Sequence, residues 1–251
     1  MPEWLQAGGW GLLAGSALVI GAAIGYLVRI PRHAVASVMA FGAGVLLSAV
    51  AFELISEADD RGGMMPTVLG AVAGALIYTG CNVLLARRGA RHRKRSGDQQ
   101  PSEQQQAGSG TAIAMGALLD GVPESIVIGT SLLGGGAVGL VTVAAVFISN
   151  VPEGLSSAAG MRNAGRSPRY VFGLWIAIAL ISGLAAVAGY TLLGGAPAAV
   201  LAAVTALAAG AILAMVADTM IPEAFESAHL LIGLVTVAGF LVAFGLSQAG
   251  R

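Results

Sequence analysis

Long apolar stretches separated by short polar segments run along the whole sequence. An α-helix needs about 20 residues to cross the roughly 30 Å hydrocarbon core of a bilayer, and each stretch has about that length. They predict eight transmembrane helices, at residues 10–28, 34–55, 67–86, 111–133, 138–159, 171–193, 198–221 and 230–246. The predicted fold class is therefore all-α, a polytopic membrane protein in which residues 1–251 form a single transmembrane domain.

The composition agrees with this class and excludes others. Of the 251 residues, 56% are hydrophobic and only 10% are charged, and the mean hydropathy is +0.82, which soluble domains of this size do not reach. A lipid bilayer is the expected surrounding. The formal net charge of zero gives no sign of a nucleic-acid partner, and the single Cys81 excludes an intrachain disulfide.

The basic residues are concentrated in every second loop. They lie between the first and second, third and fourth, and fifth and sixth stretches: Arg29, Arg32, Arg87, Arg88, Arg91, Arg93, Lys94, Arg95, Arg162, Arg166 and Arg169. Only Arg61 and Arg251 fall on the other side. The positive-inside rule then predicts a multi-pass protein of the plasma (cell) membrane with both termini outside. Residues 87–110, rich in Gln and Ser, are expected to form a flexible cytoplasmic loop.

A short internal repeat links the second and seventh stretches. Residues 44–58 (GVLLSAVAFELISEA) and 210–224 (GAILAMVADTMIPEA) share seven of fifteen positions in register, beginning with Gly44 and Gly210. The two helices run in opposite directions in the predicted topology, as do the fourth and fifth. The sequence therefore predicts a 3+2+3 inverted-repeat arrangement of three helices, a central pair and three helices, which is typical of transporters.

Two similar polar words interrupt the fourth and fifth stretches. They are DGVPES, which begins at Asp120, and SNVPEG, which begins at Ser149. A carboxylate near the middle of a membrane helix is costly to insert and by default indicates a functional site. Asp120 and Glu124 are four residues apart on one helix face, and Asn150 and Glu153 are three apart on the next helix, all near one depth.

A proline precedes the glutamate in each word. Pro123 and Pro152 have no N–H, which leaves the carbonyls of Leu119 and Ile148 without their usual helical partners. Carboxylates, an amide oxygen and free carbonyls together are suitable ligands for a divalent cation. The alternative is that both words mark kinks, whose protonated acids bond to neighbouring helices.

Glu53 on the second helix and Asp218 on the seventh are weaker candidates for a cation pathway. Each lies near the end of its stretch, so it can also reach the membrane interface as an ordinary polar side chain. No GxxxxGK[ST] word for ATP binding is present, so the ion's own gradient, the membrane potential or protons would have to drive transport.

The chain resembles the ZIP family of divalent metal transporters over essentially its whole length. The family carries His-Asn-x-Pro-Glu-Gly on its fourth helix and His-Asn-x-Pro-Glu-Gly or His-Asp-x-Pro-Glu-Gly on its fifth. The matching residues are Pro123, Glu124, Asn150, Pro152, Glu153 and Gly154. The departures are Asp120 and Ser149 at the two histidine positions, Gly121 at the asparagine and Ser125 at the glycine.

The resemblance implies uptake of divalent Zn, Mn, Fe or Cd as substrate from outside into the cytoplasm by a rocking or elevator-like motion, without enzymatic activity. It also implies an acid on the seventh helix, either Asp218 or a site shifted to Thr219. The full set of metal-ligand candidates is Asp120, Glu124, Asn150, Glu153, Asp218 and Glu53. Because both histidines are absent, we expect a selectivity that is broader than usual or shifted toward harder cations such as manganese or magnesium; the general affinity order still places zinc above manganese, so the metal identity stays open. A homodimer is compatible with this interpretation.

Two other functions stay open at this point. One is a metal-binding or metal-sensing relative that does not transport. The other is an intramembrane aspartyl protease that uses Asp120 and Asp218. The sequence lacks the Gly-x-Gly-Asp context of such enzymes, and that function leaves Glu124 and Glu153 without a role.

Overall fold

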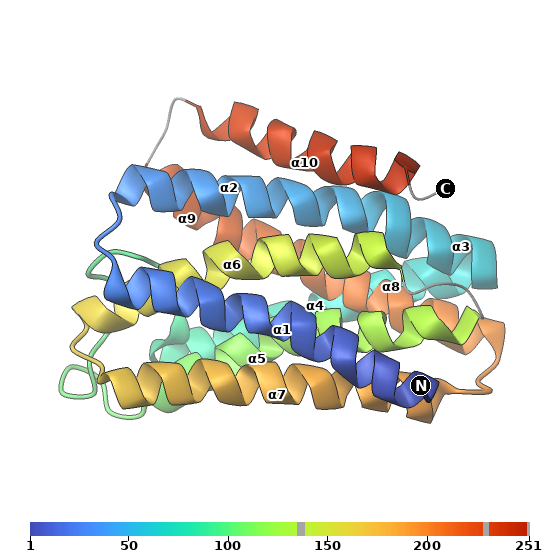
Figure 1. Cartoon of the computed structure of the whole chain (residues 1–251), viewed down its shortest axis with the longest axis horizontal. Coiled ribbons are helices and arrows are strands. Elements are labelled where there is room, and N and C mark those ends of the chain that lie inside the picture. The colour runs from blue at the N-terminus through green and yellow to red at the C-terminus, as the bar shows by residue number, and fades with distance from the viewer. Residues whose placement is uncertain (135–138, 228–230, 250–251) are drawn as a thin grey trace.

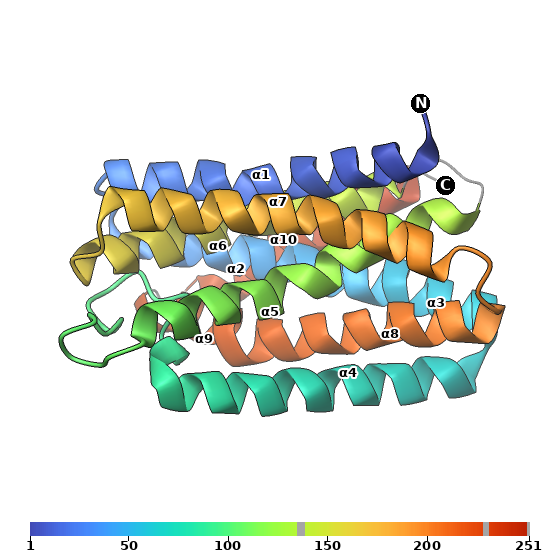
Figure 2. The ribbon, with the colours of Figure 1, turned by 90° about the horizontal axis from the view of Figure 1, so that it is seen from below.

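The computed structural model describes residues 1–134, 139–227 and 231–249, and within these ranges it contains helices and no strand. Figure 1 and Figure 2 show one elongated bundle. The elements are α1 (Glu3–Leu27), α2 (Arg32–Ala49), η1 (Val50–Ile55), α3 (Ser56–Gly62), α4 (Met64–Leu85), η2 (Ala86–Ala90), α5 (Ser109–Thr130), η3 (Ser131–Gly134), α6 (Leu140–Asn163), α7 (Pro168–Leu193), α8 (Ala198–Met215), η4 (Val216–Met220), α9 (Ile221–Ser227) and α10 (Ile232–Ala249).

The predicted all-α, multi-pass class is confirmed. In the described ranges, 8 helices are long and apolar enough to cross a membrane, one for each predicted stretch. Several extend beyond the apolar run, because a helix can continue past the hydrocarbon layer where its polar residues reach water. The second span, Arg32–Gly62, is the clearest case. The expected helix starts at Val138 and Leu230 lie outside the described residues.

The start of α1 and the end of α10 lie at the same end of the bundle (Figure 1). The turns between α1 and α2 and between α6 and α7, together with the segment between η2 and α5, lie at the opposite end. This separation of the basic segments from the termini is what the charge pattern predicts. Which end faces the cytoplasm, and in which membrane, stays a prediction.

The helices pack as two groups. The helix α1 packs on α6 and α7, and α5 also packs on α7. In the second group, α4 packs on α8 and α2 packs on α10. The element α2 also contacts α6, and α5 contacts α8, so the central pair α5 and α6 lies where the two groups meet. Any cation site on the central pair is therefore bordered by both groups.

The internal repeat has a structural counterpart. A Cβ atom added to Gly44 would lie 1.9 Å from the carbonyl oxygen of Thr236, and one added to Gly210 would lie 1.9 Å from that of Ala71. These repeat-related glycines thus allow the same close backbone contact between α2 and α10 and between α8 and α4. The arrangement as a 3+2+3 inverted repeat is still a prediction.

Both copies of the repeat also contain a π-helical segment. The segments η1 and η4 begin at Val50 and Val216, each six residues beyond the repeat glycine. A π-helical turn accommodates an extra residue and displaces the hydrogen-bond ladder, and such turns occur frequently at functional sites. The helices α2 and α8 that lead into them run in opposite directions in Figure 1. Each π-helical segment is followed by a short helix that contains acidic residues, α3 after η1 and α9 after η4.

The predicted sidedness can be tested with single cysteines in a Cys81→Ser background. Gln104 is exposed in the segment between η2 and α5, and Met64 is 76% exposed at the opposite end of the bundle. We expect a membrane-impermeant maleimide to label Met64→Cys in intact cells, and to label Gln104→Cys only after permeabilisation. Labelling of both residues in intact cells would contradict the predicted topology.

Candidate cation site

The central pair of helices carries the polar residues that the two words predict. Asp120 and Glu124 lie on α5 and are each 2% exposed, while Asn150 and Glu153 lie on α6 and are 4% and 3% exposed. Pro123 and Pro152 are accommodated within the two helices. All four polar side chains are therefore removed from water inside the bundle, where an uncompensated charge is costly.

A lysine of the chain itself lies among these carboxylates. The Nζ atom of Lys94 is 2.9 Å from Oε1 of Glu153 and 3.4 Å from Oδ2 of Asp120, and its side chain is 3% exposed. The ammonium joins the two helices of the central pair through one positive charge. This position therefore already holds a buried cation, the Lys94 ammonium, between two acids.

Arg93 neutralises Asp120 by a two-point contact. Its Nε donates to Oδ2 and its Nη2 to Oδ1, each at 2.9 Å, and the hydroxyl of Tyr78 donates to Oδ1 at 2.7 Å. A further Arg93 nitrogen donates to Oδ1 of Asn82 at 2.7 Å. Burial lowers the pKa of Arg93, but the charge and hydrogen bonds of Asp120, together with Tyr78 and Glu153, raise it above its usual value, so the guanidinium stays protonated.

The segment that brings these cations in was expected to be a flexible cytoplasmic loop over residues 87–110. The structure differs, because the middle of this segment packs into the end of the bundle. Gly89 turns the chain with a φ of 102°, and Arg93, Lys94, Ser96 and Gln100 are all buried. From its composition, the segment was predicted to be exposed to solvent. Composition could not show that the charges and amides of these residues find partners inside.

Polar side chains of the segment and of α6 support this buried backbone. The amide of Gln100 donates to the carbonyls of Arg93 and Ser157, at 3.0 and 3.1 Å. The hydroxyl of Ser156 donates to the carbonyl of Lys94. These bonds satisfy carbonyls that would otherwise be buried without partners, and they fix where Lys94 enters the bundle.

Glu223 of α9 anchors the other side of the segment. Its Oε1 accepts hydrogen bonds from the backbone N–H and the hydroxyl of Ser96, at 3.0 and 2.9 Å, and Arg95 pairs with Glu223 and Glu226. With these partners Glu223 is only 3% exposed. The segment therefore touches both helix groups, α5 and α6 in one and α4 and α9 in the other.

Glu124 is the least satisfied member of the cluster. Its Oε1 is buried and has no hydrogen-bond partner among the described residues. The charges that act on it most strongly are those of Glu153, Lys94 and Asp120. A carboxylate oxygen in that setting has free capacity to accept a proton, a hydrogen bond or a cation.

The remaining predicted ligands do not join the cluster. Asp218 is exposed on η4, and Glu53 is half-buried on η1, where it accepts a hydrogen bond from Ser247. Asn150 donates its amide to the carbonyl of Ala14 on α1, at 3.0 Å. In the part of the chain that the structure describes, no group of three or more His, Cys, Asp and Glu side chains is placed to hold a metal ion. Thr219, the alternative to Asp218, is buried but bonds within its own helix.

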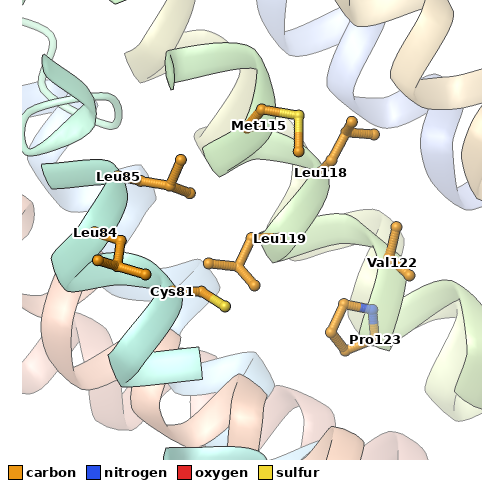
Figure 3. Close-up of a pocket in the computed structure, with 8 residues that line it drawn as sticks. All are labelled: Cys81, Leu84, Leu85, Met115, Leu118, Leu119, Val122 and Pro123. Carbon is orange, nitrogen blue, oxygen red and sulfur yellow. The ribbon is translucent and has the colours of Figure 1, made fainter. Parts of the chain in front are cut away.

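Beside the cluster, the outer surface between α4 and α5 carries an apolar groove of about 440 Å³ (Figure 3). Its lining residues are Cys81, Leu84, Leu85, Met115, Leu118, Leu119, Val122 and Pro123. This groove offers no oxygen-rich lining for a hydrated ion. We therefore do not assign it to a cation pathway.

Sequence reasoning missed Arg93, Lys94 and Tyr78 as parts of the site. The available signal was charge balance: the eight predicted stretches contain no Lys, Arg or His, yet two of them carry three central acids. Buried acids need counter-charges, and only the loops could supply them. The basic run at 91–95 was instead attributed entirely to membrane topology.

No family model matches the sequence, and no curated protein matches it.

The pairing of Arg93 with Asp120 can be tested by a double-mutant cycle. Arg93→Met leaves a buried carboxylate with only Lys94 and Tyr78 as partners, so we expect it to destabilise the fold by about 3–5 kcal/mol. Adding Asp120→Leu should restore much of this loss. Thermal unfolding in detergent is measured for Arg93→Met, Asp120→Leu and the double variant, and additive losses in the double variant would show that the two residues act independently.

Glu103 holds the segment where it leads into α5. It accepts hydrogen bonds from the backbone N–H groups of Gly108 and Gly110, each at 2.7 Å, and from Arg166 at 2.8 Å. The hydrogen bond from Arg166, followed by those from Gly110 and Gly108, lowers the pKa of Glu103 from 4.5 to about 2.

This lowered pKa predicts an acid-dependent contribution to stability. A depressed carboxyl pKa stabilises the fold above its unfolded value of 4.5, and that contribution is lost as the pH falls toward 2. We therefore expect the difference in Tm between wild type and Glu103→Gln to shrink over this range. The exposed Asp98→Asn variant is the control, and a Glu103→Gln difference that does not change with pH would contradict the assignment.

Proposed function

We propose that the protein transports divalent metal cations from outside into the cytoplasm through the site on α5 and α6. The observation that carries this proposal is the burial of three acids, Asp120, Glu124 and Glu153, at the meeting point of two helix groups, where Asp120 and Glu153 hold a cation between them. The resemblance to the ZIP family, which rests on the Pro-Glu words of both helices, supports the same function.

The charge of the site suits a divalent ion. The cluster holds three carboxyl groups and the two cations Arg93 and Lys94, so with all three carboxyl groups ionised, replacing the Lys94 ammonium by a doubly charged ion would bring the full charges into balance. The nearby donors are oxygen atoms, and Ser149 and Asp120 stand where the family has imidazoles. An oxygen-rich site favours manganese over zinc more than an imidazole site does, so the expected substrates are Mn, Fe, Zn and Cd with a bias toward the harder ions.

The two-group packing gives transport a structural basis. The central pair belongs to the first group and borders the second, and a movement of one group past the other would change the side from which Glu124 and Glu153 are reached. The backbone contacts at Gly44 and Gly210 lie within the second group, which favours its movement as one unit. An inverted repeat would supply the two related conformations.

The protease alternative fits the geometry less well. An aspartyl dyad requires two carboxyl groups that share a proton. Both oxygens of Asp120 are engaged by Arg93, Tyr78 and Lys94, whereas Asp218 is exposed on η4. A protein that binds metal without transporting it would differ from the proposed transporter only in having no metal flux across the membrane, which the following experiment measures.

The test is uptake of Mn²⁺, Fe²⁺, Zn²⁺ and Cd²⁺ into proteoliposomes by wild type, Glu124→Gln and Glu153→Gln. Each variant removes one carboxylate at nearly constant shape. Loss of groups that merely support a ligand lowers metal affinity about 10–100-fold, so we expect uptake at low metal concentration to fall at least that much.

The control for this test is Asp98→Asn. Asp98 has a side chain that is 79% exposed in a surface ion pair with Arg32, and the variant should transport like wild type. Wild-type uptake by the Glu124 and Glu153 variants would show that these acids stabilise helix kinks instead. Metal binding without uptake in wild-type vesicles would favour the non-transporting alternative.

A further inference from the structure

Lys94 is the only lysine in the sequence, and it lies inside the candidate cation site although it belongs to a loop. We propose that Lys94 is a tethered cation that occupies the transport site in place of the metal, so that Lys94 and a divalent ion exclude each other. This inference rests on the proposed function and adds to it a competing occupant supplied by the chain.

The exclusion follows from position and charge. An ion bound by Glu153 and Asp120 together would take the space where the Nζ atom now lies, 2.9 Å from one carboxylate and 3.4 Å from the other. Two cations at such separations repel strongly in a buried site. The ammonium would therefore have to leave the cluster when a divalent ion enters.

The ammonium also holds the site imperfectly, which favours its replacement. Its contact with Glu153 is an ion pair at 2.9 Å, but Nζ makes no well-directed hydrogen bond among the described residues. The Oε1 atom of Glu124 is likewise without a hydrogen-bond partner there. A lysine is a point charge with three donors, whereas a metal ion can draw several oxygens into one shell.

The position of Lys94 in the chain allows its ammonium to leave the site. It is carried by the segment between η2 and α5, so it can leave without unwinding a membrane helix. Its neighbour Arg93 binds Asp120 on α5 as well as Tyr78 and Asn82 on α4. The segment thus ties the two helix groups together while Lys94 is in the site, and its departure would loosen the cytoplasm-facing end of the proposed pathway.

The first test compares equilibrium binding of Mn²⁺ and Zn²⁺ to purified wild type, Lys94→Met and Arg91→Met. Removing an internal competitor raises the fraction of binding-competent protein, so Lys94→Met should bind these ions about tenfold or more tightly than wild type. Arg91→Met removes the same charge from an exposed position of the same segment and should bind like wild type. A folded Lys94→Met protein with unchanged affinity would overturn the proposal.

The second test uses the wild-type chain, so it does not depend on whether Lys94→Met folds. An amine-reactive acylating reagent has only two kinds of target in the sequence, Lys94 and the terminal amine, and Met1 is 78% exposed. We expect mass spectrometry to show little Lys94 modification relative to Met1 without metal, and a several-fold increase with saturating Mn²⁺. Ready modification without metal, or no increase upon Mn²⁺ binding, would overturn the proposal.

The experiments distinguish failure of the proposed transport function from failure of the proposed competition between Lys94 and metal. If neither Mn²⁺ nor Zn²⁺ binds to wild type or to Lys94→Met, the proposed function is wrong, and the competition proposal is overturned with it. If the ions bind both proteins equally and Lys94 stays unreactive throughout, the metal site exists but lies elsewhere than the position of the ammonium.

Discussion

The neutralisation of three carboxylates inside an apolar bundle is the constraint on which the rest of the site depends. Asp120, Glu124 and Glu153 are removed from water, and the membrane-spanning stretches offer no base to compensate them. The chain compensates two of the three, Asp120 and Glu153, by folding a basic segment back into the bundle end, with Arg93 on Asp120 and Lys94 between Asp120 and Glu153. Polar groups of Gln100, Ser156 and Glu223 then satisfy the backbone and side chains that enter with the two cations.

The same constraint connects the site to the packing of the helices. The buried segment can reach the central pair only because α5 and α6 lie where the two helix groups meet. Within the second group, glycines at matched positions of the internal repeat let backbones approach closely, and the π-helical segments η1 and η4 follow at equal distances from them. Close backbone packing stiffens each pair of helices, so a change in the site is more readily accommodated between the groups than within one.

The features that could be predicted from the sequence are those set by local composition. Runs of about 20 apolar residues determine the eight spans, and the Pro-Glu words place Glu124 and Glu153 inside the bundle, as the structure shows. The partners of these acids could not be predicted in the same way. Lys94 lies only one residue from Arg93 and Arg95 in a run that composition assigns to solvent, and its burial follows from tertiary contacts with Asp120 and Glu153. Asp218 and Glu53 were candidate ligands through the resemblance, but Asp218 is exposed on η4 and Glu53 accepts a hydrogen bond from Ser247 of α10 instead of joining the cluster.

The contact between Arg93 and Asp120 gives a physical reason for the departure of the sequence from the motif that it resembles. A histidine at position 120 could accept one hydrogen bond through a neutral ring nitrogen, but it could not neutralise a guanidinium by a two-point contact. An aspartate there serves Arg93 and Tyr78 at once and still lies 3.4 Å from Lys94. If the proposed transport function holds, a ligand position of the motif has here become the attachment point of the loop. Glu153 and Asp120 would then be the acids that exchange one cation for another, while Asp120 also holds, through Arg93, the segment that supplies the first.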